Sequence, residues 1–205
     1  MSITKIDTRI LEKLNFEKYT HFIFPSFSGE LSDKTIQKIN SWIEKGGTLI
    51  LFREAVNWAK ENQLVEIDIL ENELKAENIT FINRKNFKTA QSVSGAIFKA
   101  NLDRTHPINF GIENNSIALF RNTNIFLKPD DQSYNNPIKY DKNPLISGYI
   151  SKENLKTLSN TVPFKIESIE NGKIIIMTDN TNFRGYWIGT QHFLANMIFY
   201  SQFMN

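Results

Sequence analysis

One stretch near the carboxyl end limits the fold most: a short apolar run, a polar loop, and an aromatic segment leading into a helical pattern. Residues 174–177 are apolar and mostly β-branched, which is typical of a buried strand. Polar residues 179–182 follow, and the apolar segment 188–203 has the length of a helix. In open α/β sheets, ligands bind where strands end in polar loops before a helix. The stretch therefore predicts an α/β fold.

The amino-terminal quarter predicts the same architecture. Residues 21–24 and 48–52 are apolar runs typical of buried strands, and an amphipathic segment lies between them. Ser32 is the expected N-cap of that helix, and Gly46-Gly47 is expected to end it. A strand–helix–strand order predicts a parallel pair with a right-handed crossover.

The middle of the chain predicts antiparallel structure inside one domain, 1–205. A β-rich insertion is expected over residues 95–147, with a hairpin joining 117–120 to 125–127. The pair Asn171-Gly172 is a strong hairpin signal between strands at 164–169 and 174–177. Helices are predicted for residues 5–14, 55–62, 67–77 and 149–159.

Composition excludes several classes of function. Lys plus Arg number 24 and Asp plus Glu 22, so the chain lacks the basic excess of a nucleic-acid binder. Without cysteine there is no disulfide, no thiolate zinc site and no cysteine nucleophile. Residues 1–20 have no apolar core of a signal peptide, and no apolar run approaches the length of a membrane span.

The polar loop and aromatic segment contain the main candidate site. Asp179, Asn180, Asn182, Arg184 and Trp187 could hold a small polar or sugar-like ligand, with amides and Arg binding it and the indole stacking on it. The favoured alternative is a structural corner. There, Asp179 and Asn182 cap the last helix, Arg184 pairs with a carboxylate, and Trp187 packs in the core.

Residues for catalysis are sparse. His21, His106 and His192 are scattered and form no His-Glu-x-x-His pattern, which argues against a zinc hydrolase site. Ser26 and Ser28 follow the first predicted strand, but without a Gly-x-Ser-x-Gly frame they are better explained as turn formers. A degenerate hydrolase would need one of the three histidines within hydrogen-bond reach of either serine.

Several segments together resemble a known family. Residues 44–50, 55–58, 94–100, 102–107 and 179–190 come in the order found in the C-terminal region of large bacterial zinc carboxypeptidases of the carboxypeptidase A type, best known from Bacteroidetes. The Asn-Phe-Arg-Gly-Tyr-Trp element at 182–187 is the most specific part. That region is similar in fold to class I glutamine amidotransferases, so the resemblance implies a flavodoxin-like three-layer sandwich with a mostly parallel sheet.

The resemblance also implies which chemistry is missing. The family's peptidase site lies in a separate domain and uses a His-x-x-Glu pair with a distant His, and no such pair occurs here. Phe52-Arg53-Glu54 stands where an amidotransferase has its cysteine nucleophile. No catalytic residue, metal ligand or cofactor is therefore expected in this chain, and zinc is expected only in the peptidase domain of the parent.

The function expected from this resemblance is a non-catalytic accessory domain of a secreted or periplasmic metallopeptidase. It would pack on the peptidase domain, order the substrate cleft, or contribute to homo-oligomerisation. The alternative is a small-ligand or glycan binding module at the carboxyl ends of the strands. Asn180, Asn182, Arg184 and Trp187 would line that site, with Ser26 and Ser28 opposite.

Overall fold

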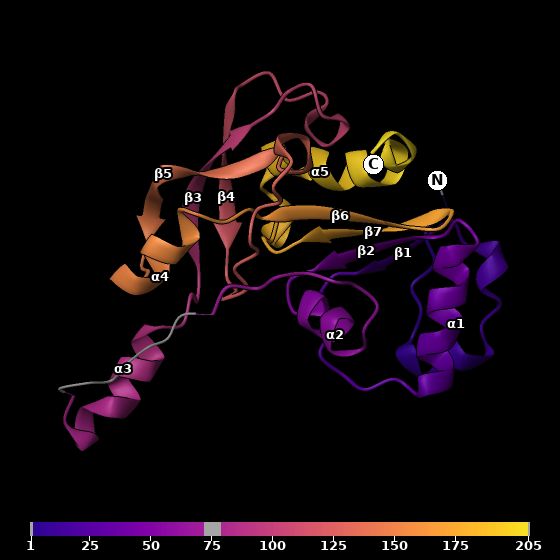
Figure 1. Ribbon diagram of the computed structural model, residues 1–205, viewed down its shortest axis with the longest axis horizontal. Helices are drawn as coiled ribbons and strands as arrows, with labels where there is room; N and C mark the ends of the chain where they lie inside the picture. Colours follow the sequence, from indigo (N-terminus) through magenta and orange to yellow (C-terminus); the bar gives the residue numbers. More distant parts are fainter. Residues whose placement is uncertain (1, 72–78, 205) are drawn as a thin grey trace.

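The computed structural model describes residues 2–71 and 79–204, which form two sheets (Figure 1). The first sheet has the order β1-β2-β7-β6. β1, β2 and β7 run parallel, and β6 pairs antiparallel with β7. The strands are β1 (His21–Phe24), β2 (Thr48–Phe52), β7 (Gly172–Met177) and β6 (Phe164–Ile169). The mostly parallel sheet confirms the predicted α/β class.

The β-rich insertion forms a second sheet, as predicted. Its order is β4-β3-β5, and both pairings are antiparallel. The strands are β3 (Ala96–Leu102), β4 (Ser116–Arg121) and β5 (Ile138–Gly148). In Figure 1 this sheet and α5 (Ile188–Phe199) lie on one side of the first sheet, with α1 (Asp33–Glu44) and α2 (Ala55–Glu61) on the other.

The central strands are covered on both faces, which explains their continuous apolar runs. Because alternate strand residues point to opposite faces, β2 and β7 contribute to two separate cores. Leu49 and Ile174 face the core that contains α1 and α2. Ile50 and Ile175 face the core that contains the second sheet and α5. All four side chains are fully buried.

The helix signals in the amino-terminal part are confirmed. Ser32 caps α1, and its Oγ accepts a hydrogen bond from the Thr35 N–H at 3.3 Å. Gly46 follows the helix with a φ of +113°, a conformation that suits glycine. The remaining α-helices are α3 (Arg84–Ala90) and α4 (Lys152–Leu158). The 3-10 helices are Thr8–Lys13, Phe16–Lys18, Phe81–Asn83, Pro107–Asn109, Ser133–Asn135, Phe183–Gly185 and Ser201–Phe203.

The predicted hairpin between residues 117–120 and 125–127 is wrong. β4 pairs with β3 instead, and Leu127 forms isolated bridges with Ile69 and Val162. The reason lies at the end of β4, where the Arg121 side chain turns inward and donates a hydrogen bond to the Ile125 carbonyl. That contact pulls the segment after β4 into the interior and away from the sheet.

Three predicted helices also differ from the structure. The first is a 3-10 helix, Thr8–Lys13, and the last α-helix ends at Phe199 before a separate 3-10 turn. Of the helix predicted at 67–77, residues 67–71 are not helical and residues 72–78 lie outside the described part. Ile69 is held in a bridge to Leu127, which accounts for its extended backbone.

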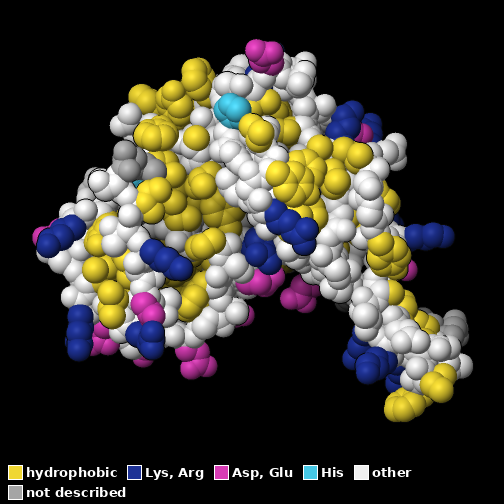
Figure 2. Space-filling view, turned by 180° about the vertical axis from the view of Figure 1, so that it is seen from behind, with side chains coloured by type: hydrophobic (Ala, Val, Ile, Leu, Met, Phe, Trp, Pro, Cys, Tyr) yellow, Lys and Arg dark blue, Asp and Glu magenta, His cyan; other side chains and the backbone are white. Residues whose placement is uncertain are grey.

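One helix stands away from both cores. α3 has no buried residue, and Figure 2 shows this arm projecting from the body with hydrophobic side chains near its tip. Phe81 and Ile82, just before α3, are both exposed. Within the described residues, no helix is long and apolar enough to cross a membrane.

Candidate functional site

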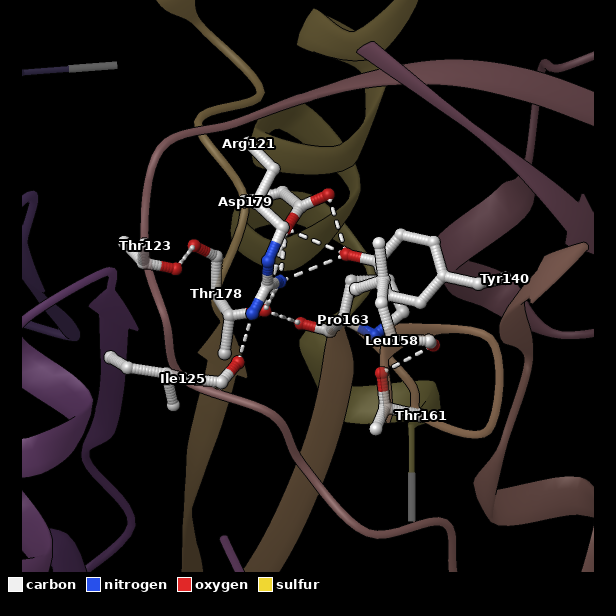
Figure 3. Close-up of polar contacts among 9 residues, drawn as sticks. All are labelled: Arg121, Thr123, Ile125, Tyr140, Leu158, Thr161, Pro163, Thr178 and Asp179. Carbon is white, nitrogen blue, oxygen red and sulfur yellow. Dashed lines mark hydrogen bonds and ion pairs between the residues drawn. The ribbon is translucent and has the colours of Figure 1, made fainter. Parts of the chain in front are cut away.

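A buried polar cluster lies at the carboxyl end of β7, where the sequence places Asp179. The Asp179 carboxylate accepts a hydrogen bond from Arg121 Nη1 at 2.7 Å. Both of its oxygens lie 2.8 Å from the Tyr140 hydroxyl (Figure 3). Arg121 ends β4 and Tyr140 belongs to β5, whereas Asp179 follows β7. The cluster therefore joins the second sheet to the first.

The Arg121 guanidinium is held from several sides. Nη1 donates to Thr178 Oγ1 at 2.9 Å, and Nη2 donates to the Ile125 carbonyl (Figure 3). The guanidinium carbon lies 5.2 Å from the centre of the Phe126 ring, a cation–π contact. Its Nε is buried and has no hydrogen-bond partner among the described residues.

Both charges of this pair are removed from water. Arg121 and Asp179 each expose 0% of their side chains. Burial raises the pKa of Asp179, an effect that the Arg121 charge opposes. Burial also raises the pKa of Tyr140 well above its usual value, so the hydroxyl keeps its proton and donates to the carboxylate. The Asp179 carboxylate therefore has no contact with solvent in this structure, and its partners are Arg121, Tyr140 and Thr178.

The helix-capping contacts predicted for the structural corner are wrong. α5 begins after Trp187 and has no side-chain cap. Asp179 is bonded to Arg121 and Tyr140 instead. Asn182 accepts a hydrogen bond from the neighbouring Thr181 hydroxyl at 2.8 Å, and it precedes the 3-10 helix Phe183–Gly185 without a side-chain capping hydrogen bond. A corner is present, but side chains from distant strands hold it together.

The segment 183–188, called here the aromatic loop, leaves this corner and reaches the surface. Phe183 stacks on Phe120 with ring centres 3.9 Å apart, which anchors the loop on β4. Arg184 is exposed, has a φ of +52°, and lies 5.0 Å over the Phe183 ring. It forms no ion pair with any carboxylate of the described residues, contrary to prediction. Tyr186 and Ile188 are 62% and 72% exposed.

Two other predicted site residues lie between the loop and the interior. Trp187 is half-buried, not part of the core, and its ring lies 6.1 Å from that of Tyr186. Its Nε1 has no hydrogen-bond partner among the described residues. Asn180 is half-buried, and its N–H donates to the Phe120 carbonyl at 2.9 Å. These contacts fix the base of the aromatic loop on the second sheet.

The predicted serines lie elsewhere. Ser26 and Ser28 are exposed in the loop after β1. Ser26 lines a cavity of about 670 Å³ beside β1, which Ser28 does not reach. Asn180, Asn182, Arg184 and Trp187 do not line this cavity either. The cavity therefore does not unite the two groups of residues.

The histidines form no catalytic pair with either serine. His21 contacts the hydroxyls of Thr20 and Ser201, at 3.0 and 3.2 Å. His106 Nδ1 accepts a backbone N–H, and His192 lies against a backbone carbonyl. Within residues 2–71 and 79–204, no group of three or more His, Asp or Glu side chains is arranged to hold a metal ion.

Sequence reasoning missed Arg121 and Tyr140. Both follow the alternating burial of their strands, with Arg121 at a buried position of β4 and Tyr140 at a buried position of β5. Arg121 could have been identified because it is a charged residue at a strand position that the alternating pattern predicts to be buried. A charge at such a position requires a buried partner. Nothing in the local pattern identifies Asp179 as that partner.

The fold and site define an α/β domain with a buried structural ion pair and an exposed aromatic loop. No protein-family profile matches the chain, and no curated protein does. Among solved structures, a cytoplasmic protein of Salmonella typhimurium is similar, with a TM-score of 0.52 at 11% identity over 96% of this chain and 78% of that one. At that identity, the similarity shows a shared fold only.

Two further structures are similar at lower scores. A putative ThuA-like protein from Bacteroides uniformis has a TM-score of 0.49 at 13% identity, with 92% of this chain and 72% of that chain covered. A β-galactosidase from Bacillus circulans has a TM-score of 0.48 at 13% identity. The aligned region covers 95% of this chain but only 24% of that enzyme.

Proposed function

We propose that this chain is a non-catalytic accessory domain that docks on a protein partner through the aromatic loop. The partner would be the zinc-binding peptidase domain of a carboxypeptidase of the carboxypeptidase A type. One observation carries the proposal: Tyr186 and Ile188 are 62% and 72% exposed on a loop that is anchored by the stacking of Phe183 on Phe120. Covering large exposed apolar side chains with a partner removes apolar surface from water, which favours association.

The physical state of the loop suits recognition. Arg184 adopts a positive φ, which costs a non-glycine residue roughly 1–2 kcal/mol, so the surrounding contacts must hold the loop in this shape. A loop already held in its bound conformation loses less entropy on association. Tyr and Arg are also among the residues that contribute most to binding at interfaces.

The same site offers little for catalysis. Asp179, the acid nearest to the loop in sequence, is fully buried and paired with Arg121. Ser26 and Ser28 have no histidine partner among the described residues. A docking role uses the exposed groups, whereas an acid–base or nucleophilic role would need the buried or unpaired ones.

The choice of partner rests on the resemblance of residues 182–187 to the C-terminal region of large bacterial zinc carboxypeptidases. That motif supplies both the anchor Phe183 and the exposed Arg184 and Tyr186. The parent enzyme would be secreted or periplasmic, and its zinc would lie in the peptidase domain. Homo-oligomerisation through the same loop is the competing use of this surface.

The test is a calorimetric titration of the 205-residue chain into the separately expressed peptidase domain. Tyr186→Ala should weaken binding by about tenfold or more, the effect of removing an interface anchor. Tyr149→Ala is the matched control, because Tyr149 is 60% exposed and lies outside the loop. Equal affinities for both variants and the parent chain would contradict docking through the aromatic loop.

The small-ligand or glycan alternative makes a different prediction for Trp187. A binding module would be favoured if Trp187→Ala has the melting temperature of the parent chain but no longer binds a glycan found by screening. A lower melting temperature for Trp187→Ala, with no glycan bound by the parent chain or by the variant, would favour the structural corner. Fluorescence titration with the screened glycan and a thermal melt distinguish the two outcomes.

A further inference from the structure

A cavity of about 670 Å³ runs beside β1, and its position relative to the strand is informative. Every residue from 18 to 27 lines it, including all four residues of β1. Successive residues of a strand point to opposite faces of the sheet. A space that touches all of them must therefore lie along the edge of the strand, not over one face. Because the other edge of β1 is paired with β2, the cavity follows the free edge.

The free edge of β1 has unused hydrogen-bonding capacity. Apart from pairing with β2, the backbone of His21–Phe24 makes no hydrogen bond to other described residues. Residues 2–6 also line the cavity, and they make no backbone hydrogen bond to β1. A row of unpaired backbone N–H and C=O groups is a template for another strand.

The walls define the chemistry of the occupant. Among the described residues no Asp or Glu lines the cavity, whereas Lys5 and Lys18 do. The apolar part of the wall includes Ile6, Phe24 and Ile198. An occupant with apolar side chains and a carboxylate would complement this surface in both shape and charge.

We propose that this cavity binds an extended peptide, which adds to the first sheet as a fifth strand beside β1. The four residues of β1 span about 13 Å, so pairing would involve about four peptide residues. The peptide backbone would bond to the edge of β1, apolar side chains would contact the walls, and a carboxylate would lie near Lys5 and Lys18. This peptide site is independent of the aromatic loop, because the two share no residue.

The first test is fluorescence anisotropy with a fluorescein-labelled pentapeptide, Val-Thr-Phe-Thr-Val, with a free carboxyl terminus. Saturable binding is expected. The same peptide with alternate amides N-methylated should bind at least about tenfold more weakly, because it keeps its side chains but cannot pair with an edge strand. The carboxyl-terminal amide form should also bind more weakly. Amide hydrogen exchange at residues 21–24 should slow when the unmodified peptide is bound.

A charge-reversal pair tests the location. Lys18→Glu should weaken binding by about fivefold or less, as expected for an exposed charge pair. Lys13→Glu makes the same change in net charge at an exposed position that does not line the cavity, and should leave affinity unchanged.

Three results would overturn the proposal. Absence of saturable binding at millimolar peptide is the first. Equal affinity for the N-methylated peptide would instead assign the cavity to a small amphipathic molecule. Protection of residues 21–24 that depends on protein concentration without peptide would assign the edge to a second copy of the chain.

Discussion

The buried pair between Arg121 and Asp179 gives the most quantitative prediction. Asp179→Asn keeps the shape of the side chain and leaves an acceptor for Tyr140. It also leaves the Arg121 guanidinium, which exposes 0% of its side chain, without a counter-charge. Removing one partner of a buried ion pair typically lowers the free energy of unfolding by about 3–5 kcal/mol. Total stabilities are about 5–15 kcal/mol, so the loss is a large fraction.

The expected change in melting temperature follows from the size of the domain. The melting temperature of a 205-residue chain falls by roughly 2–4 °C for each kcal/mol lost from the free energy of unfolding. Asp179→Asn should therefore lower the melting temperature by roughly 6–20 °C. Tyr140→Phe removes the hydrogen bond that the hydroxyl donates to Asp179 and the one that it accepts from Arg121 Nη1, but it leaves the ion pair, and it should lower the free energy of unfolding by about 1–3 kcal/mol. Urea unfolding followed by circular dichroism measures both.

Two further variants complete the test. Arg121→Met combined with Asp179→Leu removes both charges and should recover much of the stability lost in the single variant. Asp131→Asn is the control, because Asp131 is exposed. A loss below about 1 kcal/mol for Asp179→Asn would show that the pair contributes no more than an exposed ion pair does.

Other predictions concern pH and packing. Burial lowers the pKa of His106 to about 4. As pH falls from about 6.5, the unfolded state takes up this proton first, so stability should decline until about pH 4, by at most about 3 kcal/mol. His106→Gln should flatten this decline in pH-dependent urea melts. Gly172→Ala would place a methyl group against the Ile43 carbonyl and should lower the free energy of unfolding by about 1–3 kcal/mol. Gly189→Ala, with no atom within 4 Å of the added carbon, should be neutral or slightly stabilising; equal losses for both variants in thermal melts would contradict the packing argument.

The parts of the fold predicted from sequence are those set by local patterns. The apolar runs of β1, β2 and β7 and the Ser32 cap need only neighbouring residues to be recognised. The Asn171-Gly172 hairpin is also local, and β6 pairs with β7 as predicted. The α/β class follows from these elements and their order.

The site could not be predicted in the same way, because its contacts join distant parts of the chain. Arg121 lies 58 positions from Asp179, and Tyr140 lies 39 positions from it. The wrong hairpin prediction after β4 also involves Arg121, whose side chain turns into the interior and donates to the Ile125 carbonyl. The sequence contains the Asn-Phe-Arg-Gly-Tyr-Trp motif at 182–187, but it does not show which of the motif's side chains are exposed.

Docking on a peptidase domain can be measured by light scattering of the two proteins mixed at high micromolar concentration. We expect a complex with the mass of one chain plus one peptidase domain, formed by the parent chain and by Tyr149→Ala and reduced for Tyr186→Ala. If the parent chain forms no complex, it does not dock on the peptidase domain.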